Sequence, residues 1–523
     1  MEAIIHMGQI VDKHALRQPN QGVYYDNGRE VTYKEYVKEV NRMINAFKMI
    51  GLQKGDRIAT ILPQSKAFIT VFTAAAKLGI TIVPLDTRLQ LPRIQHICER
   101  TQPKMLIAQA HPEKLKDKIE TILSNIHFEH FYYYLSEVKS EGALPYERLI
   151  DKELSDVYID DLTERSSDDP LLIIFTSGTT GTPKGALITN GNIVAMAEKT
   201  AKAWDITNMD RYLLQLPTSH VGGITNLIAS MLYAGAKGVF MPDYDPKLML
   251  QCIDNYKLTF VGGVPTMFRI MFRDCDVSHY QLHSIRLIWL GGESSSPHLI
   301  NKIKSLFKES SVAASFGMTE TAGCFTYTDP EDGIEIVANT EGKPGEGSYI
   351  KIVKEDGSEA ESNEIGEIYV KGSSVISSYL DEEHNMNTFE AGWLKTGDLG
   401  SLDEKNYLKY VGRNKEMYIS GGYNVYPLEV ENYINKFPGV STSCVVEKDD
   451  EIWGQVGIAF IVPEAHSGFD LEALTFYVKN GLSDYQQPKH YIVQKSIPMT
   501  PLGKVDKQVL RKEITTYIAN PSI

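Results

Sequence analysis

The most informative segment of this 523-residue chain is Thr176-Ser177-Gly178-Thr179-Thr180-Gly181-Thr182-Pro183-Lys184-Gly185. It follows an apolar run, Leu171–Phe175, that has the composition of a buried strand. Its three glycines allow a tight turn whose backbone N–H groups can face an anion, and its hydroxyls and the Lys184 ammonium add further donors. The order differs from the P-loop pattern, because Pro183 precedes the lysine and Gly185 follows it. We therefore predict a loop that binds a polyphosphate; the alternative is a solvated polar turn.

Short apolar runs alternate with helical patterns on both sides of this loop. The strand-like runs are Ile58–Pro63, Thr81–Pro84, Leu171–Phe175, Gly238–Met241, Leu258–Val261 and Leu287–Leu290. Helical stretches between them include Phe68–Leu78, which stops at Gly79, and Asn226–Tyr233, which stops before Gly235. This alternation predicts an α/β fold with helices on the faces of its sheets.

The pattern changes after about Asn339. The runs Tyr349–Val353 and Glu367–Val370 flank an Asp-Gly turn and predict a β-subdomain of antiparallel strands. A charged connector, Gly412–Glu416, then leads to a helix that begins at Pro427. We predict a large N-terminal domain over residues 1–412, a hinge at 413–416 and a small, mobile α+β C-terminal domain over 417–523.

Composition argues against several classes of protein. Lys and Arg total 53 against 67 Asp and Glu, and the resulting net charge of −14 disfavours nucleic-acid binding. No apolar run approaches the roughly 20 residues of a membrane span, and the N-terminus lacks the pattern of a signal peptide. The five cysteines are scattered and form no C-x-x-C pair, which favours a reducing compartment. We expect a cytoplasmic protein with neither a membrane span nor a nucleic-acid partner.

The glycine-rich loop resembles the phosphate loop of the acyl-adenylate-forming (AMP-binding) superfamily, and the chain is most like the acyl-CoA and aryl-CoA ligases of that superfamily. The resemblance implies that the β- and γ-phosphates of ATP are bound by Thr176, Ser177, Gly178, Thr179, Thr180, Gly181 and Lys184. Further segments follow in the family's order. Leu290–Glu293 is similar to the turn that borders adenine, which places Gly292 and Glu293 there. Phe316 stands where the family usually has the tyrosine that stacks on adenine.

Two segments resemble the family's catalytic motifs. Ser315–Glu320 is similar to the segment in which a threonine, here Thr319, contacts the α-phosphate and a glutamate, here Glu320, binds Mg²⁺. Carboxylate oxygen is the kind of hard ligand that Mg²⁺ prefers. Pro217–Gly223 is similar to the segment whose histidine, here His220, lines the pocket for the substrate carboxylate.

Segments downstream resemble the ribose site and the movable part of the family. Thr396-Gly397-Asp398 and Gly412-Arg413 imply that Asp398 and Arg413 meet the ribose hydroxyls, and Lys415 stands at the family's hinge position. Ser420–Pro427, with Gly421 and Gly422, matches the segment beside the pantetheine of coenzyme A. Pro498–Lys507 matches the segment of the catalytic lysine, here Lys504, which would offset charge as the substrate carboxylate attacks.

The resemblance implies a two-step ligase that uses ATP, Mg²⁺ and coenzyme A. A small-molecule carboxylic acid and ATP would give acyl-AMP and pyrophosphate, and coenzyme A would then displace AMP to form a thioester. The small domain would rotate about Lys415 between the two steps.

The thiol acceptor and the acid stay open. No carrier domain precedes the end at Ile523, and Thr218–Asn226 has no acidic residue to pair with an amino acid's ammonium, so we expect coenzyme A and a non-amino acid. The alternatives are a stand-alone ligase that loads a separate carrier protein, a luciferase-like oxygenase and a non-catalytic nucleotide-binding protein. Mixed aromatic, small and polar residues around His220–Thr225, Trp289–Gly292 and Phe316–Gly323 fit a short or medium fatty acid, an aryl acid or a carnitine-like acid. Departures from the family's usual residues at Asn190, Asn406 and Gln455 bear on the substrate class.

Overall fold

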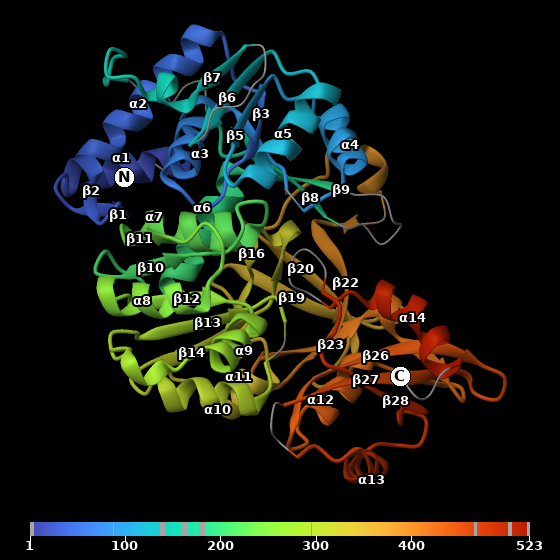
Figure 1. The fold of residues 1–523 in the computed structure, drawn as a ribbon. Helices are drawn as coiled ribbons and strands as arrows, with labels where there is room; N and C mark the ends of the chain where they lie inside the picture. The colour runs from blue at the N-terminus through green and yellow to red at the C-terminus, as the bar shows by residue number, and fades with distance from the viewer. Residues whose placement is uncertain are drawn as a thin grey trace.

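The computed structural model describes residues 5–86, 88–135, 142–158, 165–176, 184–293, 295–386, 388–464, 468–499 and 505–519. Two seven-stranded sheets form the first part of the chain, and two five-stranded sheets follow them (Figure 1). The predicted α/β class is confirmed.

The first large sheet is parallel except at one edge, where β9 runs antiparallel to its neighbour. Its strands, in spatial order, are β7 (Ala143–Pro145), β6 (His130–Tyr134), β5 (Met105–Gln109), β3 (Arg57–Ile61), β4 (Thr81–Pro84), β8 (Pro170–Thr176) and β9 (Lys184–Thr189). The second large sheet is built the same way, and only its edge strand β2 is antiparallel. In spatial order it contains β14 (Ser311–Ser315), β13 (Leu287–Gly291), β12 (Phe260–Gly263), β10 (Arg211–Leu214), β11 (Lys237–Phe240), β1 (Gly22–Asp26) and β2 (Arg29–Thr32).

Helices cover both faces of the two large sheets. Successive strand residues belong to different apolar clusters: Ile58 and Trp289 face a central core shared by the sheets, whereas Ala59 and Ile288 face outer cores. The helices of the central layer are α1 (Met7–Arg17), α2 (Tyr33–Ile50), η1 (Tyr146–Ile150), α6 (Asn190–Ala203), the π-helix η3 (Gly222–Ala229), α7 (Ser230–Ala234) and α3 (Lys66–Leu78). Those of the outer layers are α4 (Leu91–Thr101), α5 (Glu113–Asn125), α8 (Pro246–Tyr256), α9 (Pro265–Asp274), α10 (Pro297–Leu306) and α11 (Ile334–Asn339).

Local sequence sets the helix ends. The Ser65 hydroxyl accepts the Phe68 N–H at 3.3 Å at the start of α3, and Gly79 ends this helix with φ of 66°. The helix predicted over Asn226–Tyr233 begins earlier, at Gly222. Its first part is the π-helix η3, which is wider than an α-helix, and the short α-helix α7 follows it. π-Turns of this kind are frequent at functional sites.

The third sheet is the β-subdomain predicted after Asn339. It contains β19 (Ser348–Val353), β20 (Gly366–Gly372), β21 (Phe389–Glu390), β22 (Trp393–Leu402) and β23 (Leu408–Arg413), all in antiparallel pairs. Short two-stranded pairs join it to the second sheet: β15 (Gly317–Met318) with β16 (Gly323–Cys324), and β17 (Thr326–Tyr327) with β18 (Lys343–Pro344).

The C-terminal residues form a sheet of their own, drawn in orange and red in Figure 1. Its elements are β24 (Tyr418–Ser420), β25 (Tyr423–Val425), α12 (Pro427–Ile434), β26 (Val440–Asp450), β27 (Gly454–Pro463), α13 (Leu471–Gly481), β28 (His490–Val493) and α14 (Lys507–Ala519). The helices α12 and α13 pack on one face and α14 on the other. The predicted hinge falls between β23 and β24, in the short 3₁₀ helix η7 (Asn414–Glu416).

Within the described residues, no helix has both the length and the apolar character that crossing a bilayer requires.

A buried carboxylate ties together the amino ends of three neighbouring strands in the second sheet. Asp210, just before β10, is 3% exposed. It accepts hydrogen bonds from the Thr259 hydroxyl at 2.7 Å and from the Arg286 guanidinium at 2.7 and 2.8 Å. Thr259 precedes β12 and Arg286 precedes β13, so one side chain aligns three strand starts.

Replacing Asp210 by Asn removes the charge from these hydrogen bonds. We expect Asp210→Asn to lower the free energy of unfolding by about 2 kcal/mol, because hydrogen bonds to charged groups contribute more than neutral ones. Urea unfolding followed by circular dichroism measures the change. Asp205→Asn is the matched control, since Asp205 is exposed and its φ of 48° suits asparagine. Equal midpoints for the two variants would contradict the assignment.

Candidate functional site

The ends of the glycine-rich loop are fixed beside each other. β8 and β9 pair in antiparallel register, and the last pair joins Thr176 to Lys184. The intervening Ser177, Gly178, Thr179, Thr180 and Gly181 lie outside the described residues, and so does Lys504. The loop therefore starts at the carboxyl end of β8, the edge at which open α/β sheets bind ligands.

Glu320 is connected to the lysine end of this loop through a tyrosine. Glu320 lies in the 3₁₀ helix η5 (Thr319–Thr321) and is 6% exposed. Its Oε1 accepts a hydrogen bond from the Tyr379 hydroxyl at 2.9 Å, and the Lys184 ammonium lies 5.4 Å from the centre of the Tyr379 ring. Tyr379 is held against β9, because the Leu380 N–H donates to the Gly185 carbonyl at 2.7 Å.

The electrostatics of Glu320 fit a site for a cation. Burial raises the pKa of this carboxyl, while the Tyr379 hydrogen bond and the positive charges of Arg413 and Lys184 act in the opposite direction. Burial also raises the pKa of Tyr379, so its hydroxyl stays protonated and donates. An ionised carboxylate supplies the hard oxygen donor that Mg²⁺ prefers, so Glu320 could hold this metal. Thr319, which the resemblance places at the α-phosphate, precedes Glu320 in the same turn and is buried with it.

The predicted ribose residues face each other across two strands. Asp398 on β22 pairs with Arg413 on β23, and Asp398 Oδ1 lies 3.4 Å from both the Arg413 Nε and the Tyr410 hydroxyl. Burial lowers the pKa of Arg413, but Asp398, Tyr410 and Glu416 outweigh it and the net shift is upward. The Phe316 ring lies 6.0 Å from the Tyr410 ring and is 8% exposed within the core of the third sheet. Only the uncovered part of that ring can meet an adenine.

His220 lies two residues before the π-helix η3, and η3 contacts β16, the strand that pairs with β15 of the catalytic motif. The His220 Nδ1 accepts the Gly222 N–H at 3.0 Å, which leaves the proton of the neutral ring on Nε2. Farther along η3, the Asn226 side-chain oxygen accepts the Cys324 N–H at 3.0 Å. Gly323 has φ of 125°, and a Cβ there would lie 2.0 Å from the same oxygen, so glycine is required at this contact.

The residues predicted to border adenine lie at the carboxyl end of β13. Gly292 has φ of 84°, which glycine adopts without strain. The Glu293 carboxylate is directed to α9, where it lies 3.5 Å from the Arg269 guanidinium and 3.4 Å from the Thr266 hydroxyl.

The remaining predicted residues lie at or beyond the end of β23. Lys415 is the middle residue of η7. Gly421 and Gly422, with φ of 59° and 86°, form the two-residue turn between β24 and β25, and the Gly421 N–H donates to the Trp453 carbonyl at 2.8 Å. No described contact joins this turn to Glu320, so the structure brings together Thr176, Lys184, Glu320, Asp398 and Arg413 and leaves the glycine pair apart.

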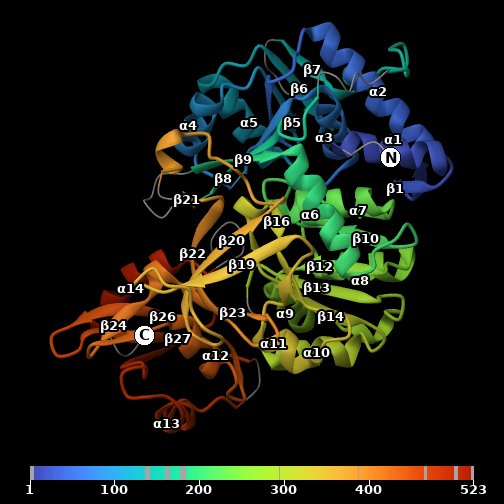
Figure 2. The ribbon, with the colours of Figure 1, turned by 180° about the vertical axis from the view of Figure 1, so that it is seen from behind.

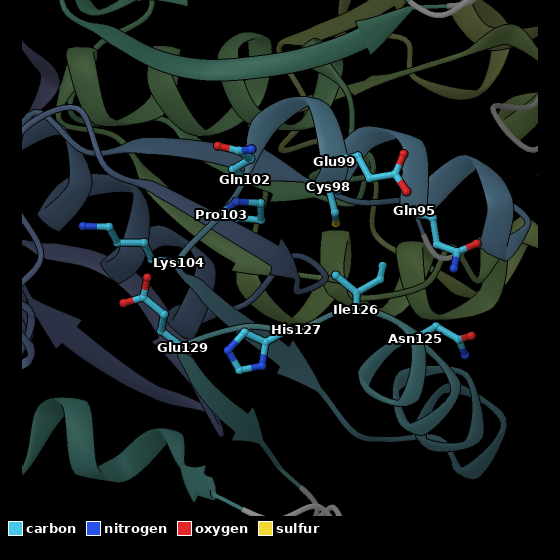
Figure 3. Close-up of a pocket in the computed structure, with 10 residues that line it drawn as sticks. All are labelled: Gln95, Cys98, Glu99, Gln102, Pro103, Lys104, Asn125, Ile126, His127 and Glu129. Carbon is cyan, nitrogen blue, oxygen red and sulfur yellow. The ribbon is translucent and has the colours of Figure 1, made fainter.

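A separate cavity of about 380 Å³ lies between the carboxyl ends of α4 and α5 (Figure 3). Its lining includes Cys98, Lys104 and Glu129 and none of the predicted site residues that the structure describes. It is therefore not the predicted site.

Comparison with known proteins identifies the family. The AMP-binding enzyme family matches residues 11–380, and its C-terminal domain matches residues 429–504. This chain is an AMP-binding enzyme.

Curated relatives and solved structures agree with this assignment over almost the whole AMP-binding enzyme. The putative acyl-CoA ligase YdaB of Bacillus subtilis (strain 168) is 32% identical over 492 residues, covering 92% of this chain and 94% of that protein. The 2-succinylbenzoate–CoA ligase of Bacillus licheniformis is 31% identical over 496 residues, covering 94% and 97%. ATP-bound MatB from Rhodopseudomonas palustris is 27% identical and superposes with a TM-score of 0.86 over 98% of both chains. The predicted family and the class of acid–thiol ligase are confirmed.

Three residues of this AMP-binding enzyme's site were missed in the sequence. Tyr379 and Tyr410 support Glu320 and Asp398, and Asn226 joins the π-helix to β16, the strand that pairs with β15 of the motif. Tyr379 stands in no motif, so nothing in the sequence indicates its role. Tyr410 lies three residues before Arg413 on the same strand. Side chains alternate between the two faces of a strand, so this spacing predicts opposite faces and gives only a weak indication that Tyr410 lies beside Arg413.

Removing the Tyr379 hydroxyl tests the environment of Glu320. We expect Tyr379→Phe to shift the acid limb of ATP–pyrophosphate exchange to higher pH. The hydrogen bond stabilises the ionised carboxylate, so its loss raises the pKa of Glu320 further. Tyr410→Phe is the matched control, because its hydroxyl faces Asp398 instead. An acid limb that does not move in Tyr379→Phe would show that Glu320 does not control this step.

Proposed function

We propose that this AMP-binding enzyme is an ATP-dependent carboxylic acid–coenzyme A ligase. The observation that carries the proposal is the convergence on one buried carboxylate, Glu320, of Lys184 from the glycine-rich loop and Arg413 from the end of the third sheet. We infer that these charges, which come from elements far apart in the sequence, form part of the site for a nucleoside triphosphate and its metal. We also propose a cytoplasmic location, which the five cysteines support because all of them are free thiols.

The first half-reaction activates the acid. A carboxylate oxygen attacks the α-phosphorus of ATP, the bond to the bridging oxygen breaks, and pyrophosphate leaves with its electron pair. In our proposal the loop from Thr176 to Lys184 holds the β- and γ-phosphates, Thr319 contacts the α-phosphate, and Lys504 offsets the charge of attack. Mg²⁺ held by Glu320 would supply further charge neutralisation on the phosphates. Asp398 and Arg413 hold the ribose, while Gly292, Glu293 and Phe316 border the adenine.

The second half-reaction transfers the acyl group to the thiol of coenzyme A. The thiol sulfur attacks the acyl carbon, AMP leaves, and the thiol proton passes to solvent or to a base. We propose that the small C-terminal domain turns about Lys415, which removes Lys504 and brings Gly421 and Gly422 beside the pantetheine. A glycine pair presents no side chain there, so the backbone can approach the thin pantetheine arm. We propose that His220 lines the carboxylate pocket and moves between the two half-reactions.

The described side chains favour a compact acid. Trp289 projects from β13 into the central layer, where a Cβ on Gly262 would lie 2.4 Å from its ring and 3.3 Å from Leu227 of the π-helix. Its Nε1 donates to the Ser315 hydroxyl at 2.9 Å, and the side chain is 4% exposed. The indole therefore fills space between the sheet and the helix that begins after His220, which leaves less room for a long chain.

A panel of carboxylic acids tests the proposed function. The enzyme is incubated with ATP, Mg²⁺ and one acid from each class: short fatty, medium fatty, aryl or carnitine-like. Two quantities are measured for each acid, namely ATP–pyrophosphate exchange and the release of AMP with and without coenzyme A. We expect AMP release that depends on both the acid and coenzyme A. Pyrophosphate exchange without transfer to coenzyme A would indicate a carrier-protein ligase instead. Absence of exchange with every acid would indicate a non-catalytic nucleotide-binding protein.

Substitution of Lys504 should affect the two half-reactions differently. We expect Lys504→Ala to reduce adenylate formation by about 100-fold or more, the loss typical of removing one charge-stabilising donor. Thioester formation from supplied acyl-AMP should stay near the wild-type rate. Lys495→Ala is the control, since Lys495 is an exposed lysine of the same region. An equal loss of both steps would refute the two-conformation assignment.

Lys415 tests the hinge. We expect Lys415→Pro to slow the second half-reaction selectively, because proline restricts the backbone rotation that domain alternation requires. Lys415→Ala removes the side chain but leaves the backbone free, and should retain both steps. Single-turnover measurement of acyl-AMP formation and its consumption by coenzyme A separates the two rates. Selective loss of the first step would place the hinge elsewhere.

A further inference from the structure

One lysine on α6 is buried and forms no ion pair with any carboxylate that the structure describes. Lys199 on α6 is 6% exposed, and its Nζ donates to the Ser348 hydroxyl at 2.7 Å. The neighbouring Glu198 carboxylate binds Lys202 at 3.0 Å instead. Among the residues that the structure describes, no carboxylate forms an ion pair with Lys199. An ammonium has three donors, and a buried charge is costly unless it is paired, so this group lacks the partner that its burial calls for.

A cavity of about 280 Å³ lies beside this lysine. Its walls come from α6, the β17–β18 pair and the segment that leads into β19, and Figure 2 shows α6 next to β19. Lys199 forms part of its wall, as do Lys202, Tyr327, Lys343 and Tyr407. None of the described residues of the nucleotide site lines it, so it is a different place on the molecule.

The charges around this cavity leave an excess of positive charge. Lys202 is paired at the rim with Glu346 at 2.9 Å, and the Asp329 carboxylate accepts the Glu331 N–H at 2.9 Å. Lys343 forms no ion pair in the described part of the chain, and its ammonium lies 4.5 Å from the centre of the Tyr407 ring. Three ammonium groups thus line the cavity with two carboxylates, one of which is already neutralised.

We propose that this cavity, which we call the lysine cavity, binds a small phosphate group between Lys199 and Lys343. A phosphate oxygen would supply the acidic partner that Lys199 lacks and would accept its two remaining N–H groups. The Ser348 hydroxyl already contacts the Lys199 ammonium, whereas the hydroxyls of Tyr327 and Tyr407 donate to the Cys324 carbonyl and to Asp332, so the two ammonium groups supply the donors for the phosphate. The group comes either from inorganic phosphate or from a small phosphorylated molecule, because both present the same oxygens.

The titration of Lys199 gives this proposal a distinctive signature. Burial lowers its pKa to about 8, and an anion beside it favours the charged form. Binding at pH 8.5 therefore takes up a proton, whereas binding at pH 7 takes up less. Burial raises the pKa of Tyr327 and Tyr407, so both hydroxyls stay protonated at these pH values. The groups that face Lys199 or its cavity are Glu198, Lys202, Tyr327, Asp329, Lys343, Glu346 and Tyr407.

Calorimetric titration of the full chain with inorganic phosphate tests the site. The titration is run at pH 8.5 in two buffers of different ionisation enthalpy, and again with glycerol phosphate. We expect Lys199→Met to weaken binding by about tenfold or more and to abolish the dependence of the binding enthalpy on the buffer. Lys199→Met itself should fold, because replacing an unpaired buried charge by an apolar chain of similar shape is stabilising. Lys343→Met, at the exposed side of the cavity, is the second variant and should also weaken binding.

Two controls make the outcome decisive. Lys479→Met alters an exposed lysine on α13 and should leave binding unchanged. Lys184→Met impairs the glycine-rich loop, so phosphate that still binds this variant occupies another place. Loss of binding in Lys184→Met, wild-type binding in Lys199→Met, or no binding to the wild-type chain would each overturn the proposal. Tighter binding of glycerol phosphate than of inorganic phosphate would identify a phosphorylated molecule as the occupant.

Discussion

The burial of the Glu320 carboxylate is the constraint on which the site depends. A carboxylate taken out of water is costly unless hydrogen bonds and opposite charges compensate for it. Here the compensation comes from Tyr379, Lys184 and Arg413, which belong to three different parts of the chain. Three distant parts of the chain therefore meet at this carboxyl group, and burial still outweighs their compensation, so the pKa of Glu320 is raised.

The topology explains how these parts meet. The glycine-rich loop follows the parallel strand β8 of the first sheet, whereas the turn at Gly292 and the catalytic motif follow β13 and β14 of the second, so all three lie at carboxyl ends of strands. The segment at Tyr379 then joins the two groups, because it pairs with β9 by a bridge to Ala186 and its hydroxyl donates to Glu320. Asn226 adds a contact from the π-helix, because its side-chain oxygen accepts a hydrogen bond from the Cys324 N–H. Each contact uses backbone or buried groups, so the site is fixed by the same packing as the fold.

Sequence patterns predict those features that local physics determines. The strand Thr81–Pro84 and the end of α3 at Gly79 were predicted correctly, since apolar runs and a left-handed glycine act locally. The motif residues around Glu320 and Asp398 were indicated by the resemblance to the AMP-binding superfamily, since an isolated acidic residue carries little signal of its own. Tyr379 and Asn226 act through contacts between distant segments, which no local pattern encodes. The π-helix η3 was missed because its apolar composition also fits an ordinary buried helix.

The connector Gly412–Glu416, which joins the third sheet to the C-terminal sheet, is held by ion pairs at both ends. Arg413 is held by Asp398 on the side of the third sheet. On the other side, Lys507 binds Glu416 at 2.9 Å and Glu431 at 3.2 Å, which ties the connector to α14 and α12. Rotation of the small domain that preserves both attachments must therefore change the backbone at Asn414 and Lys415. Lys507 lies three residues after Lys504 in the sequence, so the helix that follows the proposed catalytic lysine is joined directly to the end of the proposed hinge.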